Sequence, residues 1–285
     1  MFVMMNAARL HVALQGIGLL DAAWQKADAY ARERKQMRVP GPRDASQAAD
    51  AIVGHPAMRR ILDTQRAWVL GSRLLAYQTG IELDLARSHP AADRRQQAQT
   101  WCSLLTPVLK AACTEQAFLG ASECLQVFGG HGYVREWGIE QIVRDARIAM
   151  IYEGTNEIQA IDLLVRKVMG DKGQALTTLL AELQADLAVK DADAAQQAEF
   201  ARMATALNEA TAQLLARAAT APDHVYWVAG DYLRALTLVL LAWSWARIDK
   251  ASTGADARWV APSQALRAWV LPEFDMRLRL LSTVV

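Results

Sequence analysis

Apolar residues recur at helical spacing from the beginning of the chain. Between residues 5 and 34 they fall at Leu10, Leu14, Ile17, Leu20, Trp24 and Ala27. This is the period of one face of an amphipathic helix. Gly16 and Gly18 lie inside the pattern, where each costs about 1 kcal/mol against alanine. We therefore expect both glycines to pack closely against a neighbouring helix, and the helix to end near residues 36–38, ahead of Pro40.

The same pattern predicts further helices up to residue 168, after a loop at residues 38–53. They cover about 56–86, 93–127, 141–150 and 157–168. The helix at 56–86 is expected to stop at residues 88–90, which end in a proline. The helix at 93–127 is expected to stop at the glycine-rich residues 129–132. Residues 169–173 contain two glycines and form the best candidate for a domain boundary.

Beyond this boundary the chain is again helical in pattern. Helices are predicted at about 174–188, 193–219, 223–250 and 263–282, with turns at 191–197 and 252–256. Five tryptophans occur in this part: Trp227, Trp243, Trp245, Trp259 and Trp269. A tryptophan-rich surface usually packs on another element, so we expect them at the contact between the two parts. The prediction is an all-α protein: an up-down four-helix bundle at residues 1–169, followed by a second helical domain at residues 170–285.

Composition narrows the classes of function. The chain has 285 residues, 53% of them hydrophobic and only 8 prolines, which excludes a disordered or collagen-like protein. Its formal net charge is +1, and residues 171–285 contain 11 basic and 13 acidic residues. Such a balance does not attract nucleic acid or an anionic membrane. The longest apolar run, residues 235–246, is too short to cross a bilayer and predicts a buried helix.

The cysteines indicate neither disulfides nor a metal site. Cys102, Cys113 and Cys124 lack a CxxC spacing. Their repeat of eleven residues places all three on one helix face, where small apolar core residues are expected. Free thiols fit a reducing compartment, and no basic segment precedes the apolar N-terminus. We therefore predict a cytoplasmic protein without a structural metal.

Two polar segments carry candidate chemistry. The glycines at residues 129–132 leave the backbone free for close approach of a ligand, although a plain helix cap explains them as well. Glu153 lies in a polar break between apolar segments, where a carboxylate beside an apolar substrate has a raised pKa and is suited to take a proton from carbon. The alternatives are a solvated or capping Glu153, with Thr155 or Asn156 as the cap of the next helix.

Three segments taken together resemble the signature of acyl-CoA dehydrogenases. They are residues 125–133 (LQVFGGHGY), residues 144–159 (RDARIAMIYEGTNEIQ) and residues 30–36 (YARERKQ). The resemblance covers roughly residues 5–168. It implies a flavoprotein that uses FAD to convert an acyl-CoA thioester into a trans-2-enoyl-CoA, with electron-transferring flavoprotein as acceptor. It also implies a homo-oligomer, either a dimer or a dimer of dimers.

The resemblance also implies roles for individual residues. Glu153 removes the α-proton of the thioester while a hydride leaves the β-carbon for the flavin, which performs the redox chemistry. Arg34 and Gln36 match contacts to the FAD diphosphate. The remaining implied cofactor contacts are Thr155 and Glu157, together with Gln126, Gly129 and Gly130, whose segment reaches FAD of a neighbouring subunit. The residues implied to lie near substrate or base are Arg9, Tyr152 and Gly154.

The sequence departs from the family pattern at two positions. Some members carry the base where this chain has Ala8, which leaves Glu153 as the candidate. Glu157 stands where the family often has Gln or Gly; it either raises the pKa of Glu153 by charge repulsion or is simply solvated.

The extent of the chain leaves the function open. The inserted loop at residues 38–53 and the helical extension after Gly170 resemble a subgroup that has an additional C-terminal domain and includes the dehydrogenases of 3-methylmercaptopropionyl-CoA. The N-terminal helical domain and β-domain of the family have no counterpart in residues 1–285. We therefore weigh an enzyme fragment or half of a split enzyme against a non-catalytic oligomerisation module. A nucleic-acid-associated relative is disfavoured by the acidic extension.

Overall fold

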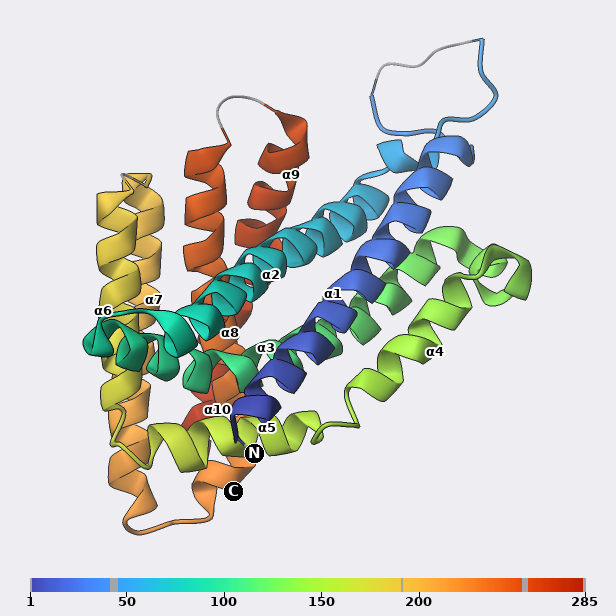
Figure 1. Ribbon diagram of the computed structural model, residues 1–285. Coiled ribbons are helices and arrows are strands. Elements are labelled where there is room, and N and C mark those ends of the chain that lie inside the picture. The colour runs from blue at the N-terminus through green and yellow to red at the C-terminus, as the bar shows by residue number, and fades with distance from the viewer. Residues whose placement is uncertain (1, 42–45, 191, 253–255, 284–285) are drawn as a thin grey trace.

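The four helices of the first part form an antiparallel bundle. The computed structural model describes residues 2–41, 46–190, 192–252 and 256–283. Helices α1 (Phe2–Glu33), α2 (Pro56–Ser88), α3 (Ala92–Phe128) and α4 (Ile139–Ala149) run alternately up and down (Figure 1). Helix α3 contacts each of the other three. The predicted all-α fold and the bundle are confirmed.

Helix α1 ends earlier than predicted, at Glu33 rather than near residues 36–38. The reason is an isolated antiparallel bridge between Lys35 and Ala51. Its hydrogen bonds, from the Ile52 N–H to the Arg34 carbonyl and from the Gln36 N–H to the Asp50 carbonyl, draw the chain out of the helix. The predicted loop at 38–53 is irregular until the short 3₁₀ turn η1 (Ile52–Gly54), and its residues 42–45 lie outside the described residues.

The last segments of the first part include 3₁₀ turns and a π-helix as well as α-helices. Helix α4 is preceded by the 3₁₀ turns η2 (Gly129–Tyr133) and η3 (Arg135–Trp137) and followed by a turn. The predicted helix at 157–168 is an α-helix, α5 (Asn156–Ile161), that continues as a π-helix, η4 (Asp162–Val168). Thr155 caps α5 by accepting a hydrogen bond from the Ile158 N–H at 3.4 Å. The capping alternative for Thr155 is therefore confirmed.

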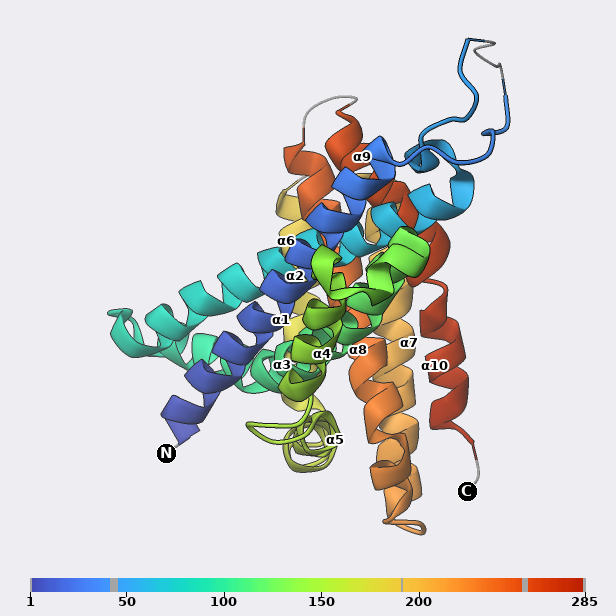
Figure 2. The same cartoon turned by 90° about the vertical axis from the view of Figure 1, so that its right-hand side faces the viewer.

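The extension forms a group of helices beside the bundle (Figures 1 and 2). Its helices are α6 (Gln174–Val189), α7 (Ala194–Ala218), α8 (His224–Ala251), α9 (Ala257–Ala265) and α10 (Glu273–Leu281), with a π-helical η5 (Leu266–Val270) after α9. The single helix predicted at 263–282 is wrong. Pro272, which has no N–H to donate, separates η5 from α10. Of the predicted turns, residues 191 and 253–255 lie outside the described residues.

Helix α8 is the core of the extension. By length and composition it is apolar enough to cross a membrane, but 72% of its apolar window is buried inside the protein. It contacts α7 and α10 in the extension and α2, α3 and α5 in the first part of the chain. The prediction of a buried helix in this region is confirmed.

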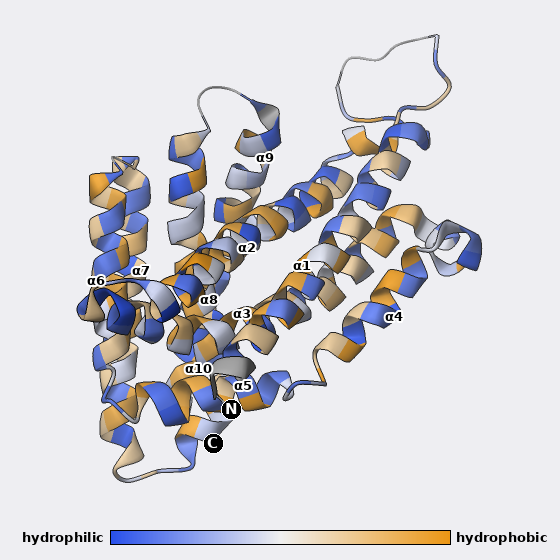
Figure 3. Cartoon of the chain, in the orientation of Figure 1, coloured by the Kyte–Doolittle hydropathy of each residue, from blue (hydrophilic) through white to orange (hydrophobic). Residues whose placement is uncertain are grey.

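One hydrophobic core runs through both parts of the chain. Its buried side chains come from α1, α2 and α3 as well as from α6, α7, α8 and α10; Figure 3 shows the apolar and polar residues distributed along these helices. Trp243 meets Trp101 edge to face at 5.9 Å, and the Trp245 indole donates to the Ala67 carbonyl at 3.0 Å. The expected interface role is wrong for Trp227, which is 65% exposed. Trp269 is 53% exposed, but the guanidinium of Arg60 in α2 lies 4.0 Å from its ring centroid, so it does contact the bundle.

The two glycines of α1 differ in their surroundings. A Cβ on Gly16 would lie 2.7 Å from the backbone oxygen of Cys113 in α3, so the two helices approach closely there. A Cβ on Gly18 would meet nothing within 4 Å. The prediction of close packing is thus confirmed for Gly16 and wrong for Gly18, which is exposed.

Alanine substitutions at these positions should have opposite effects. Gly16→Ala is expected to lower the free energy of unfolding by about 1–3 kcal/mol, because the backbone of α3 cannot move aside as a side chain can. Gly18→Ala should raise it by up to about 1 kcal/mol, because alanine favours the helix. Urea denaturation followed by circular dichroism measures both values. Equal changes in the two variants would contradict this account.

Candidate functional site

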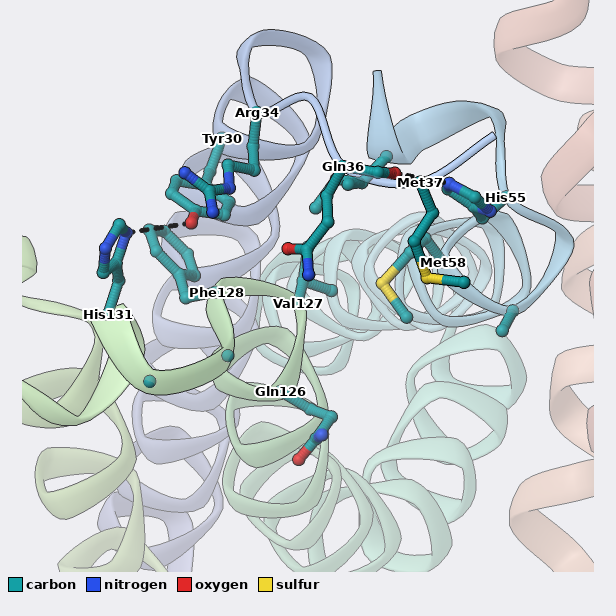
Figure 4. Close-up of a pocket in the computed structure, with 14 residues that line it drawn as sticks. Tyr30, Arg34, Gln36, Met37, His55, Met58, Gln126, Val127, Phe128 and His131 are labelled. Carbon is teal, nitrogen blue, oxygen red and sulfur yellow. Dashed lines mark hydrogen bonds between the residues drawn. The ribbon is translucent and has the colours of Figure 1, made fainter. Parts of the chain in front are cut away.

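Five predicted cofactor residues line one groove at the end of the bundle (Figure 4). They are Arg34, Gln36, Gln126, Gly129 and Gly130. The groove has a volume of about 550 Å³ and lies between the end of α1, the start of α2 and the end of α3. The bridge that ends α1 is what turns residues 34–36 toward α2. Segments predicted separately from the sequence therefore meet in one place.

Aromatic side chains form one wall of this groove. Tyr30 stacks on Phe128 with 4.4 Å between ring centroids. Its hydroxyl shares a 2.9 Å hydrogen bond with Nδ1 of His131, whose ring in turn stacks on Trp137 at 5.0 Å. These contacts fix the turn that follows α3. Sequence analysis did not single out His131 or Trp137, although both stand next to the glycine motif.

In the part of the chain that the structure describes, the groove contains a guanidinium without a counter-ion and a glycine backbone that no neighbouring atom covers. Among the described residues, the exposed guanidinium of Arg34 has no ion-pair or hydrogen-bond partner. Gly129 caps α3 with φ of 58°, and a Cβ built on Gly129 or on Gly130 meets nothing within 4 Å. Gly129 therefore caps α3 and also leaves its backbone open to a ligand, so its two interpretations do not exclude each other.

The remaining lining of the groove is mixed. Gln36 extends toward Val127, with Met37, Met58 and His55 on one side of it (Figure 4), and the His55 ring nitrogen Nε2 lies 3.0 Å from the Gln36 carbonyl. A guanidinium, side-chain amides and a glycine backbone that a ligand can approach closely are suited to phosphate and ribose oxygens. The residues present fit one portion of a flavin dinucleotide.

The candidate base lies elsewhere, on the turn between α4 and α5. Helix α4 has 11 residues and so separates this turn from the groove by about 16 Å. Glu153 is exposed and has φ of 57°, and Gly154 follows with φ of 85°. The left-handed conformation costs a residue with a side chain about 1–2 kcal/mol. The structure therefore does not bring Glu153, Thr155 or Glu157 into the groove.

A buried lysine of α3 holds this turn. Lys110 is fully buried, and its ammonium group donates to the Gly154 carbonyl at 2.8 Å and to Oδ1 of Asn156 at 3.0 Å. The Gln159 side-chain amide donates to the carbonyls of Glu153 and Gly154, both at 3.2 Å. Burial lowers the pKa of Lys110 to about 8, although the carboxylates of Glu157 and Glu153 favour its charge.

Sequence analysis missed Lys110, yet a signal was present. It is the single charged residue in the apolar stretch 104–113. A lone ammonium on an apolar helix face is costly unless it finds partners. Asp162 is likewise the single charged residue among the mostly apolar residues 158–165.

Arg9 forms a buried ion pair. Its guanidinium lies 2.6 Å from Asp162, which is 2% exposed and also pairs with Arg166 and Lys167. Burial opposes the charge of Asp162, but these three cations outweigh it and hold the pKa of the carboxyl below its usual value. Arg9 is thus on the same end of the bundle as the Glu153 turn, and it ties α1 to η4.

The other residues implied near the base are part of the turn or its cap. The Tyr152 hydroxyl donates to the Gln15 side chain of α1, which anchors the turn on that side. Glu157 is exposed, as its solvated alternative expects. Its own backbone N–H and the Thr155 hydroxyl hold the pKa of Glu157 below its usual value.

The three cysteines are buried, as predicted. Burial raises the pKa of the Cys102, Cys113 and Cys124 thiols to about 12. Such thiols remain protonated near neutral pH and are poor nucleophiles. Within the described ranges, no group of three or more His, Cys, Asp or Glu side chains is arranged to hold a metal ion.

Comparison with known proteins identifies relatives of the chain. The sequence model of the family described as "Acyl-CoA dehydrogenase, C-terminal domain" matches residues 2–169. The chain is 42% identical over 237 residues to a 3-methylmercaptopropionyl-CoA dehydrogenase of Ruegeria pomeroyi, covering 79% of this chain and 39% of that protein. It is 35% identical over 192 residues to the broad-specificity linear acyl-CoA dehydrogenase FadE5 of Mycobacterium tuberculosis, covering 65% of this chain and 30% of that protein.

The fold is also found among solved structures. An acyl-CoA dehydrogenase of Bacillus anthracis, complexed with FAD, aligns over 100% of this chain and 53% of its own, with a TM-score of 0.69 and 19% identity. The alignment extends through the helices after residue 170. The chain spans about two-fifths or less of the curated relatives it matches.

The lowered pKa of Lys110 predicts a pH-dependent stability difference. The folded chain holds this proton more weakly than the unfolded chain, so the unfolded chain binds more protons between pH 8 and 10.5. The unfolding free energy of the wild type relative to Lys110→Met should therefore rise with pH in this window, by up to about 1 kcal/mol per pH unit. Urea denaturation at several pH values measures it.

The matched control is Lys190→Met, which removes an exposed lysine. Its stability should follow that of the wild type in parallel through the same pH window. Parallel curves for Lys110→Met as well would show that Lys110 has an ordinary pKa in the folded chain.

Proposed function

Because the chain belongs to the acyl-CoA dehydrogenase family, we propose that it supplies the catalytic base and part of the FAD site for oxidation of an acyl-CoA thioester to a trans-2-enoyl-CoA. The observation that carries the proposal is the groove in which Arg34, Gln36, Gln126, Gly129 and Gly130 meet. Its cation, amides and open glycine backbone suit the phosphates and sugar of FAD. When bound, FAD supplies the acceptor for the hydride that leaves the β-carbon of the substrate.

Glu153 performs the proton transfer in this proposal. Its carboxylate takes the α-proton of the thioester, so that the C–H electron pair becomes the new double bond as the β-hydride departs. The turn presents Glu153 on its exposed side, while its backbone is tied to α3 and α5 through Lys110 and Gln159. The base is thus held on rigid elements and is open to a substrate that approaches from outside the bundle.

The partners follow from the same proposal. Acyl-CoA is the substrate, electron-transferring flavoprotein is the electron acceptor, and the enzyme is a cytoplasmic homo-oligomer, a dimer or a dimer of dimers. Exposed apolar side chains beside the groove support a covered surface there: Tyr133 is 85% exposed and Trp137 is 40% exposed. Residues 1–169 carry the site, and residues 170–285 form a second unit that braces α2 and α3.

A non-catalytic helical module is the second candidate. The observation that favours it is the position of Glu153, which is exposed and lies outside the groove. Visible absorbance of the purified chain separates the two candidates. A yellow protein, or one that takes up added FAD, supports the flavin site, whereas a chain that stays colourless after reconstitution supports the module.

Replacement of the base should stop the reaction without removing the flavin. In the flavin-loaded enzyme that contains this chain, Glu153→Gln is expected to slow acyl-CoA-dependent flavin bleaching by about 10²–10⁴-fold, because the amide cannot accept the proton. FAD content should be unchanged. Anaerobic stopped-flow absorbance measures the rate, and Glu136→Gln, an exposed carboxylate beyond the groove turn, is the control. Full activity of Glu153→Gln refutes its role.

A side chain at Gly130 should block the groove while the fold persists. Gly130→Leu introduces a side chain where a Cβ meets no atom within 4 Å, so the helices need not shift. We expect FAD affinity to fall at least about tenfold, or ~1.4 kcal/mol, with little change in unfolding free energy. Flavin fluorescence titration measures the affinity. Gly18→Leu, at another exposed and unobstructed glycine, should bind FAD as the wild type does; unchanged affinity in Gly130→Leu would place FAD elsewhere.

A further inference from the structure

The most unusual buried group outside the groove is the ammonium of Lys110. This side chain is fully buried in α3 and directs two of its three N–H donors to the turn that carries Glu153. We propose that Lys110 is a positioning residue, whose ammonium group fixes the backbone of residues 153–156 and thereby the direction of the Glu153 carboxylate. This inference rests on the function proposed above for Glu153.

The turn requires such a support because its backbone is strained. Glu153 and Gly154 adopt consecutive left-handed conformations, with φ of 57° and 85°. A left-handed residue with a side chain persists only where surrounding contacts determine it. The Gly154 carbonyl accepts from both Lys110 and Gln159, which uses both of its lone pairs. While this carbonyl points inward, the Glu153 side chain stays on the exposed face of the turn.

Helix α3 also binds the turn through Asn156. Oδ1 of Asn156 accepts from Lys110 at 3.0 Å and from the Thr114 hydroxyl at 3.1 Å. The Asn156 amide also donates to the Ala111 carbonyl at 3.2 Å. Lys110 is the one donor that reaches both Gly154 and Asn156 among the described residues, so it holds the left-handed Gly154 and the start of α5 to one helix.

The charges around Lys110 are consistent with a charged clamp. The carboxylates of Glu157 and Glu153 favour the ammonium, whereas Arg9 disfavours it. Asn156 and Gly154 contribute neutral acceptors. A buried ammonium needs oxygen acceptors, and both acceptors of Lys110 lie on the turn that carries Glu153.

Lys167 provides a matched control. It is also a largely buried lysine whose pKa burial lowers to about 8. It donates to the Ser103 carbonyl and pairs with Asp162, but it makes no hydrogen bond to the turn. Lys167→Met therefore removes a comparable buried ammonium at the same end of the bundle without touching the clamp.

The first test is amide hydrogen exchange on the 285-residue chain. Lys110→Met should speed exchange of the amides at residues 152–156 by at least about tenfold through local opening, while Lys167→Met leaves them unchanged. Unchanged exchange in Lys110→Met, or an equal increase in both variants, overturns the proposal. If Lys110→Met does not fold, Lys110→Gln, which keeps an amide donor, decides: faster exchange confined to the turn supports the clamp, and unchanged exchange rejects it.

The second test is a double-mutant cycle in the flavin-loaded enzyme. Lys110→Gln should lower kcat for flavin reduction at least about tenfold with little change in KM, because the base is misdirected after the substrate has bound. In the Glu153→Gln background the same substitution should have no further effect. Additive losses overturn the positioning role. Loosening of the turn together with full activity of Glu153→Gln would instead refute the proposed function and leave the clamp standing.

Discussion

The packing of α3 against the other three bundle helices and against α5 and α8 is the constraint on which the structure depends. Its backbone touches α1 so closely at Cys113 that only glycine fits opposite, at Gly16. Its aromatic residue Trp101 meets α8 of the extension, and its C-terminal cap, Gly129, opens the groove. A helix packed against several neighbours cannot shift toward one of them without disturbing the others, so the two candidate sites share a single rigid support.

Most of the fold could be predicted from the sequence because its helices are long and periodic. The bounds of α2 and α3 were within a few residues of the prediction, since proline and glycine mark their ends. The end of α1 was wrong, because a bridge between residues far apart in the chain overrides local propensity. The exposed surroundings of Gly18 were likewise invisible, because periodicity places a residue on a helix face only approximately.

The candidate site was predictable in its members and not in its arrangement. Motif resemblance named Arg34 and Gly130, and the structure brings them into one groove. It also named Glu153, which lies at the far end of α4. Lys110 escaped notice because a lysine within an apolar helix has no motif, and its acceptors on Gly154 and Asn156 become apparent only in three dimensions.

The length of helix α4 limits the insertions and deletions that the protein can accept. Its 11 residues join the groove turn to the turn that bears the carboxylate. Adding or deleting one residue there would swing one end about 100° around the helix axis relative to the other and shift it by about 1.5 Å. In the proposed function both ends of α4 face one bound molecule, so the length of this helix sets the distance and direction between them.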